Sequence, residues 1–215
     1  WRVKMKQVAK SKYLKYLFIF VFLFIFLLLL EGVLEKEIMM CDLWGYNFVN
    51  KYLRSDVATF IFKFITNFGD APYIIAVALL ATIFFKTKNI GIAIFANLGL
   101  CALLNQVLKF VIQRPRPSGY HYVLASGYSF PSGHSMVSMA FYGLLIYFIY
   151  KSNYDQTWKY LFMVLFGLLI FLIGLSRIYL GVHYVSDVLA GFVLSISYLF
   201  VFVSVMNSLE KKYEK

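Results

Sequence analysis

Six stretches of this chain contain no aspartate, glutamate, lysine or arginine, and their length limits what it can fold into. They are residues 16–30, 71–85, 89–108, 118–150, 160–176 and 188–209. A helix that crosses a bilayer needs about 20 mostly apolar residues. Flanking lysines such as Lys15 and Lys86 extend the two shorter stretches, because their long side chains reach the interface. Six spans are therefore predicted, near residues 15–34, 69–86, 90–108, 133–150, 159–176 and 186–207.

The composition excludes an ordinary soluble domain. The chain is 61% hydrophobic and only 14% charged, whereas soluble domains are about half apolar and about a quarter charged. Lipid offers no partner to backbone amides, so apolar runs of this length favour helices. A membrane barrel would alternate apolar and polar residues, and these stretches do not. We therefore expect an all-α fold: a six-helix membrane bundle that forms one domain over residues 1–215, with the first span kept as an uncleaved anchor.

The longest polar connection, residues 31–70, lies between the first and second predicted spans. Its phenylalanines recur at helical spacing, as at Phe60 and Phe64, and Ser55 or Asp56 can cap a helix start. We expect one or two amphipathic helices there, lying on the outer membrane surface. They would form either a lid or lipid-access wall over a site, or a plain interfacial connector.

The net charge of +11 indicates orientation rather than a nucleic-acid partner. With the N-terminus inside, thirteen of the 21 basic residues fall on the inner side: Arg2, Lys4, Lys6, Lys10, Lys12, Lys15, Lys86, Lys88, Lys151, Lys159, Lys211, Lys212 and Lys215. Short cytoplasmic segments carry an excess of lysine and arginine. Both termini are therefore predicted to be cytoplasmic in a multi-pass cell-membrane protein.

The first of three unusual clusters is "KFVIQRPRP", residues 109–117. Arg114 and Arg116 each precede a proline, which holds them on a stiff extended segment after Lys109. A fixed guanidinium fork suits a phosphate. Anchoring at the headgroup level is the alternative, but it fits poorly because this outer side should be poor in basic residues.

The second cluster, "PSGH", opens the fourth predicted span at residues 131–134. Proline suits the first turn of a helix, glycine allows a backbone amide to approach a ligand, and a helix start offers free N–H groups to an anion. His134 would then face whatever occupies that site. Taken alone, the pattern fits a helix cap beside a structural histidine equally well.

The third cluster, "SRIYLGVHYVSD", covers residues 176–187. His183 and Asp187 are four residues apart, so on a helix they share a face. A carboxylate bonded to one imidazole nitrogen leaves the other free as base or nucleophile. Arg177 adds a cation, although a lone His–Asp pair would be read as structural.

All three clusters fall on the outer side of the predicted topology, where together they are cationic. Ionisable residues near membrane depth point to function, and a cationic site points to an anionic ligand. Two histidines among cations suit phosphoryl transfer, while a metal site would need more carboxylates.

Together the clusters resemble the signature of the type-2 phosphatidic acid phosphatase superfamily, membrane lipid phosphatases related to vanadium haloperoxidases. The family pattern is K-x6-RP, PSGH and SR-x5-H-x3-D. The matching residues are Lys109, Arg116 and Pro117; Pro131, Ser132, Gly133 and His134; Ser176, Arg177, His183 and Asp187. Three separate motifs in order make the match specific.

The resemblance implies a role for each matched residue. His183 would be the nucleophile that forms a phosphohistidine, Asp187 would orient it, and His134 would act as acid and then base. The phosphate would be bound by Lys109, Arg116, Arg177, Ser132 and the Gly133 amide, with no metal or other cofactor. Arg114 and His121 lie outside the pattern. A headgroup contact is open for both, although a surface position is favoured for His121.

The implied function is hydrolysis of a phosphate or diphosphate group on a lipid at the extracytoplasmic face. The candidate substrates are undecaprenyl diphosphate, phosphatidylglycerol phosphate and phosphatidic acid. The expected partners are this lipid and the bilayer, with no nucleic acid and no obligatory protein. Three alternatives stay open: a non-enzymatic lipid-phosphate binding or transport protein that keeps the phosphate cradle, an oxidative enzyme that holds vanadate, and a metal-dependent lipid phosphatase.

Overall fold

The computed structural model describes residues 2–36, 38–85, 88–119 and 121–213, with the backbone alone for 2–12, 88 and 213. Within these ranges every regular element is helical, which confirms the all-α prediction. The α-helices are α1 (Arg2–Leu34), α2 (Met40–Phe48), α3 (Asp56–Thr66), α4 (Ala71–Phe85), α5 (Lys88–Ile112), α6 (Gly133–Lys151), α7 (Gln156–Tyr179) and α8 (Val185–Tyr213). A π-helix, η1 (Val49–Leu53), follows α2, and a 3-10 helix, η2 (Asn67–Gly69), follows α3.

Five helices are long and apolar enough to cross a membrane: Tyr13–Leu34 of α1, Asn89–Ile112 of α5, the whole of α6 and α7, and Val185–Lys212 of α8. The second predicted span corresponds to α4, which has only 15 residues. At 1.5 Å per residue it is about 22 Å long, short of the hydrocarbon thickness of about 30 Å. Joined to α3 and η2 across a 58° bend, it makes the sixth candidate span. The protein is therefore a multi-span membrane protein, with five candidate spans among the described residues, or six if this bent pair is counted as one.

The other helices match the predicted spans but run beyond them. The helix predicted at residues 15–34 begins at Arg2, and the one predicted at 186–207 continues to Tyr213. Lysine and glutamate are good helix formers, so the helix continues where the chain leaves the apolar region. Hydrophobicity alone therefore locates the membrane segment of each helix rather than its ends.

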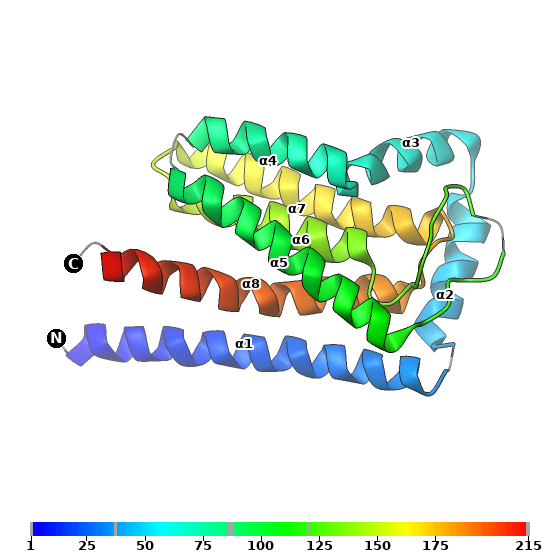
Figure 1. Ribbon diagram of the computed structural model, residues 1–215, viewed down its shortest axis with the longest axis horizontal. Helices are drawn as coiled ribbons and strands as arrows, with labels where there is room; N and C mark the ends of the chain where they lie inside the picture. The colour runs from blue at the N-terminus through cyan, green and yellow to red at the C-terminus, as the bar shows by residue number, and fades with distance from the viewer. Residues whose placement is uncertain (1, 37, 86–87, 120, 214–215) are drawn as a thin grey trace.

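The connections between the helices gather at two opposite ends of the bundle (Figure 1). Both chain ends lie together, at the same end as the α4–α5 and α6–α7 connections. At the opposite end lie α2, α3 and the connections that follow α5 and α7. Clusters that are far apart in the sequence are thereby brought to one end.

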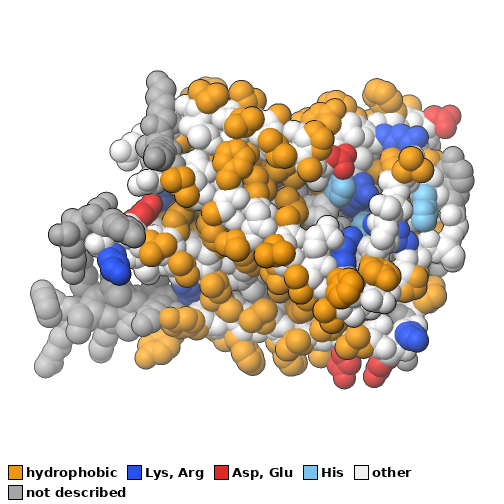
Figure 2. All heavy atoms as spheres, in the orientation of Figure 1, with side chains coloured by type: hydrophobic (Ala, Val, Ile, Leu, Met, Phe, Trp, Pro, Cys, Tyr) orange, Lys and Arg blue, Asp and Glu red, His pale blue; other side chains and the backbone are white. Residues whose placement is uncertain are grey.

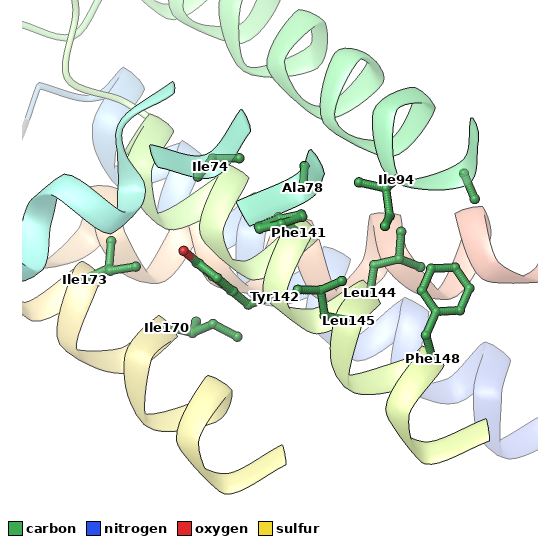
Figure 3. Packing of buried hydrophobic residues seen from close by; sticks show 11 residues of the cluster. Ile74, Ala78, Ile94, Phe141, Tyr142, Leu144, Leu145, Phe148, Ile170 and Ile173 are labelled. Carbon is green, nitrogen blue, oxygen red and sulfur yellow. The ribbon is translucent and has the colours of Figure 1, made fainter. Parts of the chain in front are cut away.

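Helix α6 lies at the centre of the bundle and packs against α5, α7 and α8. Of its most apolar 18-residue stretch, 56% is buried, against 11% for the peripheral α1. Phe141, Tyr142, Leu144 and Leu145 fill the core around it (Figure 3). Since α6 begins at Gly133, this packing fixes the position of the "PSGH" cluster.

The one or two amphipathic helices predicted between the first two spans correspond to α2 and α3. Ser55 caps α3 as predicted, because its Oγ accepts a hydrogen bond from the Ala58 amide at 3.1 Å. Phe60 and Phe64 on α3 are exposed, as is Trp44 on α2. The other face of α3 packs against α7, so this segment is held firmly over the end of the bundle.

Candidate active site

The three sequence clusters meet in a pocket of about 290 Å³ at the end of the bundle that carries α2 and α3. Figure 2 shows basic and histidine side chains gathered at this end of the visible face. The pocket is lined by Thr66, Asn67, Asp70, Lys109, Arg116, Val123, Leu124, Ala125, Ser126, Gly133, His134, Arg177 and His183. Six of the eight predicted site residues are among them; Ser132 and Asp187 lie just behind.

The segment after α5 holds the first cluster in place. Gln113 ends the helix in the left-handed region, with φ of 54°. Beyond it, the Ser129 amide donates to the Arg114 carbonyl at 2.9 Å and Ser129 Oγ donates to the Pro115 carbonyl at 2.9 Å. These bonds pair the proline-rich segment with residue 129, as a stiff extended stretch requires. Arg116 is thereby directed into the pocket.

The start of α6 supplies both a cap and an open amide. Ser132 is the N-cap: its buried Oγ accepts hydrogen bonds from the Ser135 amide at 3.4 Å and the Ser135 hydroxyl at 3.0 Å. Its side chain therefore serves the helix rather than lining the pocket. Gly133 does line the pocket, and a Cβ there would lie 3.0 Å from the Asn105 Oδ1 atom. Glycine thus allows the start of α6 to pack closely against Asn105.

His183 is buried with both ring nitrogens engaged. Its Nδ1 lies 3.3 Å from Asp187 Oδ2, and its Nε2 lies 3.1 Å from Arg116 Nη1. A guanidinium only donates, so Nε2 accepts and Nδ1 carries the hydrogen that faces Asp187. Burial lowers the pKa of His183 to about 3, although Asp187 opposes this shift. The ring is therefore neutral, with the Nε2 lone pair on the pocket side, as a nucleophile requires.

His134, on the first turn of α6, has a carboxylate of its own. Its Nε2 lies 2.9 Å from Oδ1 of Asp70, whose side chain is 44% exposed. Gly69 permits this approach, because a Cβ there would lie 2.6 Å from His134 Cδ2. Sequence reasoning missed Asp70, which lies at the bend before α4, at the end of a segment interpreted either as a lid or as an interfacial connector. A lone aspartate there gives no signal of its own.

The three cations predicted to hold the phosphate all lie at the pocket. Lys109 Nζ donates to the Tyr128 carbonyl at 2.8 Å, and Arg177 Nη1 donates to Thr66 Oγ1 at 2.6 Å. Arg177 Nε is buried and has no hydrogen-bond partner among the described residues. A buried donor without an acceptor is costly. The pocket is therefore well suited to an anion.

The two residues outside the family pattern are not part of the pocket lining. Arg114 is 8% exposed and forms ion pairs with Asp42 at 2.9 Å and Asp187 at 2.6 Å. His121 Nε2 lies 2.8 Å from the Pro117 carbonyl within its own loop. Asp42, on α2, was also missed, because a single acidic residue in a connection does not reveal a partner 72 residues away.

Comparisons with known proteins agree with the motifs. The family model of the PAP2 superfamily matches residues 90–211, more than half of the chain. Over 141 residues the chain is 37% identical to phosphatidylglycerophosphatase B of Bacillus subtilis (strain 168), covering 64% of this chain and 70% of that protein. It is 30% identical over 157 residues to an undecaprenyl-diphosphatase of Sulfolobus acidocaldarius, covering 69% and 71%.

A solved structure extends the similarity to most of the fold. The crystal structure of a transmembrane PAP2-type phosphatidylglycerolphosphate phosphatase from Bacillus subtilis superposes with a TM-score of 0.78 at 29% identity. The match covers 88% of this chain and 96% of that one. The resemblance inferred from the three motifs is therefore confirmed, and the chain belongs to the PAP2 superfamily.

Proposed function

We propose that this protein is a lipid phosphatase that works through a phosphohistidine and needs no metal. The observation that carries the proposal is that His183 and His134 line one cationic pocket, with Asp187 directly behind His183. Lys109, Arg116 and Arg177 supply positive charge where a phosphate would develop negative charge. The similarity to phosphatases acting on two different lipid phosphates supports the same class of substrate.

In the first step, Nε2 of His183 attacks phosphorus and the bond from phosphorus to the leaving oxygen breaks. His134, protonated, gives its proton to that oxygen. The cations hold the equatorial oxygens of the phosphoryl group. The imidazole of His183 becomes positive, and Asp187 stabilises this charge through the Nδ1 hydrogen.

In the second step, His134 is neutral and takes a proton from water as its oxygen attacks phosphorus. The N–P bond breaks, its electron pair returns to Nε2 of His183, and inorganic phosphate leaves. Both histidines recover their starting protonation states. In this scheme His183 carries the phosphoryl group and His134 transfers the protons.

The position of the site supports a lipid substrate whose phosphate enters from the headgroup layer while its tail stays in the bilayer. Undecaprenyl diphosphate, phosphatidylglycerol phosphate and phosphatidic acid all fit this description. The lysine-rich ends favour cytoplasmic termini, which would put the site on the extracytoplasmic side of the cell membrane. Cysteine labelling at position 133 tests the orientation, because a label that reacts only from the cytoplasm would reverse it.

The central experiment is phosphate release from a panel of these three lipids by purified protein in detergent. The His183→Ala protein is the blank, and excess chelator is added in a parallel series. We expect release that the chelator does not affect. Binding of the lipids without release would favour a non-enzymatic carrier, and loss of activity in chelator would favour a metal-dependent enzyme.

A further inference from the structure

A chain of buried charges lies behind the proposed nucleophile, away from the pocket. Arg114 Nη1 lies 2.6 Å from Asp187 Oδ1, and Arg114 Nη2 lies 2.9 Å from Asp42 Oδ2. The side chains of both aspartates are 0% exposed, and that of Arg114 is 7% exposed. One guanidinium thus bridges a carboxylate of α2 to the carboxylate that faces His183.

Further hydrogen bonds fix both carboxylates. Asp187 Oδ2 faces His183 and accepts from the Tyr184 amide at 2.9 Å, so both of its oxygens are engaged. Asp42 accepts from the Ser186 amide and hydroxyl, each at 2.8 Å. Neither carboxylate can rotate without breaking several bonds. The Nδ1 side of the His183 ring is therefore held by groups outside the pocket.

The charges of these buried groups favour the phosphorylated state of His183. Two carboxylates and one guanidinium sum to one negative charge while His183 is neutral. When His183 accepts a phosphoryl group, its ring becomes positive and the four groups sum to zero. Charge stabilisation is strong where water is excluded.

We propose that Arg114 and Asp42 are positioning residues for His183. This inference rests on the proposed function. Arg114 holds Asp187 so that His183 presents Nε2 to phosphorus, and Asp42 holds Arg114. Neither residue lines the phosphate pocket. Because Asp42 belongs to α2, the helix over the end of the bundle becomes part of the catalytic support.

The bridge requires an arginine. Its planar fork lets two nitrogens bind two carboxylates on opposite sides, while a lysine offers a single charged nitrogen. The Tyr184 ring lies 4.1 Å from the guanidinium carbon, which also favours a flat cation. Arg114→Lys should therefore keep the charge but recover only part of the function.

The test compares turnover of a lipid phosphate by full-length Arg114→Gln, Arg114→Lys and Asp42→Asn proteins in detergent, using phosphatidylglycerol phosphate, undecaprenyl diphosphate and phosphatidic acid. We expect Arg114→Gln to lower kcat about 100-fold and Asp42→Asn about 10-fold, with KM and vanadate inhibition changed by less than about threefold. KM and the inhibition by vanadate should change little because the phosphate-binding cations are untouched. Lys51→Gln and Asp56→Asn, at exposed positions at the same end of the molecule, are controls and should stay within about twofold.

A double mutant separates positioning from simple structural support. In an Asp187→Asn background, Arg114→Gln should lower kcat by less than about a further threefold, because its effect acts through Asp187. An equal loss in both backgrounds, or an Arg114→Gln protein within about threefold of wild type, would overturn the inference. If Arg114→Gln does not fold, Arg114→Lys and Asp42→Asn decide by the same criterion.

The proposed function fails in a different way. A wild-type protein that releases phosphate from none of the three lipids overturns that function, and this inference falls with it. An active wild type, an inactive His183→Ala protein and an unaffected Arg114→Gln protein overturn the positioning role alone.

Discussion

The two histidines of the pocket each have an aspartate within reach, but the two pairs are built differently. The His183–Asp187 pair is sealed, with side-chain exposures of 2% and 0%. The His134–Asp70 pair is open, with exposures of 19% and 44%. Asp187 is held by an arginine and a backbone amide, whereas Asp70 lies at the bend between η2 and α4.

The difference fits the two tasks in the proposed reaction. A nucleophile must be neutral and fixed so that its lone pair meets phosphorus, which burial and a rigid carboxylate achieve. An acid and base must pass protons to a leaving group and take them from water, which requires access to solvent. The same pair of residue types therefore suits two different tasks, because the two pairs differ in burial and in the groups that hold the aspartate.

The largest effect is expected from removing the nucleophile. His183→Ala should lower phosphate release by at least about 10⁵-fold, because the proposed covalent intermediate forms on this side chain. Release is measured on the purified protein, with size-exclusion chromatography to show that it folds. His121→Ala should stay near wild type. A loss of less than about 10⁴-fold in His183→Ala would contradict the assignment.

Removal of the acid should depend on the leaving group. His134→Ala should lower turnover of a lipid phosphate by about 10³- to 10⁴-fold. With p-nitrophenyl phosphate, whose leaving oxygen needs no proton, the first step should recover while the second stays slow. Phosphorylated enzyme should then accumulate, as measured by acid-quench trapping of labelled phosphate. Equal losses on both substrates, without accumulation, would assign His134 another role.

Breaking the sealed pair should lower kcat more than breaking the open pair. Asp187→Asn should lower kcat about 10²- to 10³-fold, because the amide neither fixes the correct tautomer nor balances the positive ring. KM should change much less. Steady-state kinetics across a range of lipid concentration separates the two constants, and a rise in KM alone would refute this role.

Breaking the open pair should have a modest effect. Asp70→Asn should lower kcat about 10-fold, because His134 loses a carboxylate that stabilises its protonated form but keeps its position against Gly69. The comparison with Asp187→Asn is made on the same lipid in the same detergent. A larger loss in Asp70→Asn than in Asp187→Asn would reverse the distinction between the two pairs.

The smallest effect concerns stability. The native pKa of His183 is about 3, against an ordinary value of 6.5. Between these values the unfolded chain binds a proton that the native protein does not, so this residue makes stability fall as pH drops from 6.5 toward 3. His183→Gln removes that contribution. Its melting temperature in detergent should fall less between pH 7 and pH 4.5 than that of wild type, and an equal or steeper fall would contradict the buried neutral state.

The convergence of the three clusters could be predicted from sequence because each lies at the end of an apolar run. The alternation of spans then puts Lys109, His134 and His183 on one side whatever the details of packing. What the sequence does not contain is the direction of individual side chains. Ser132 and Gly133 are neighbours, yet one caps the helix and the other lines the pocket, because that depends on the first turn of α6.

Long-range partners were harder to predict still. Arg114 and Arg116 stand in the same "RPRP" repeat, but one faces Asp187 in the interior and the other the pocket. Asp42 and Asp70 meet their partners only when α2 and the start of α4 pack beside parts of the chain that are distant in the sequence. The bend at Asp70 likewise depends on packing, since residues 71–85 read as a short but ordinary apolar stretch.

Arg116 has one further consequence for how the pocket works. Four hydrogen bonds already occupy it: to the carbonyls of Ser126, Gly127 and Val182, and to His183. An arriving phosphate must displace some of these acceptors, so its affinity is a net difference rather than a sum of new contacts. The loop carbonyls compete again after hydrolysis. We therefore expect inorganic phosphate, the product of the proposed reaction, to bind weakly and to inhibit little.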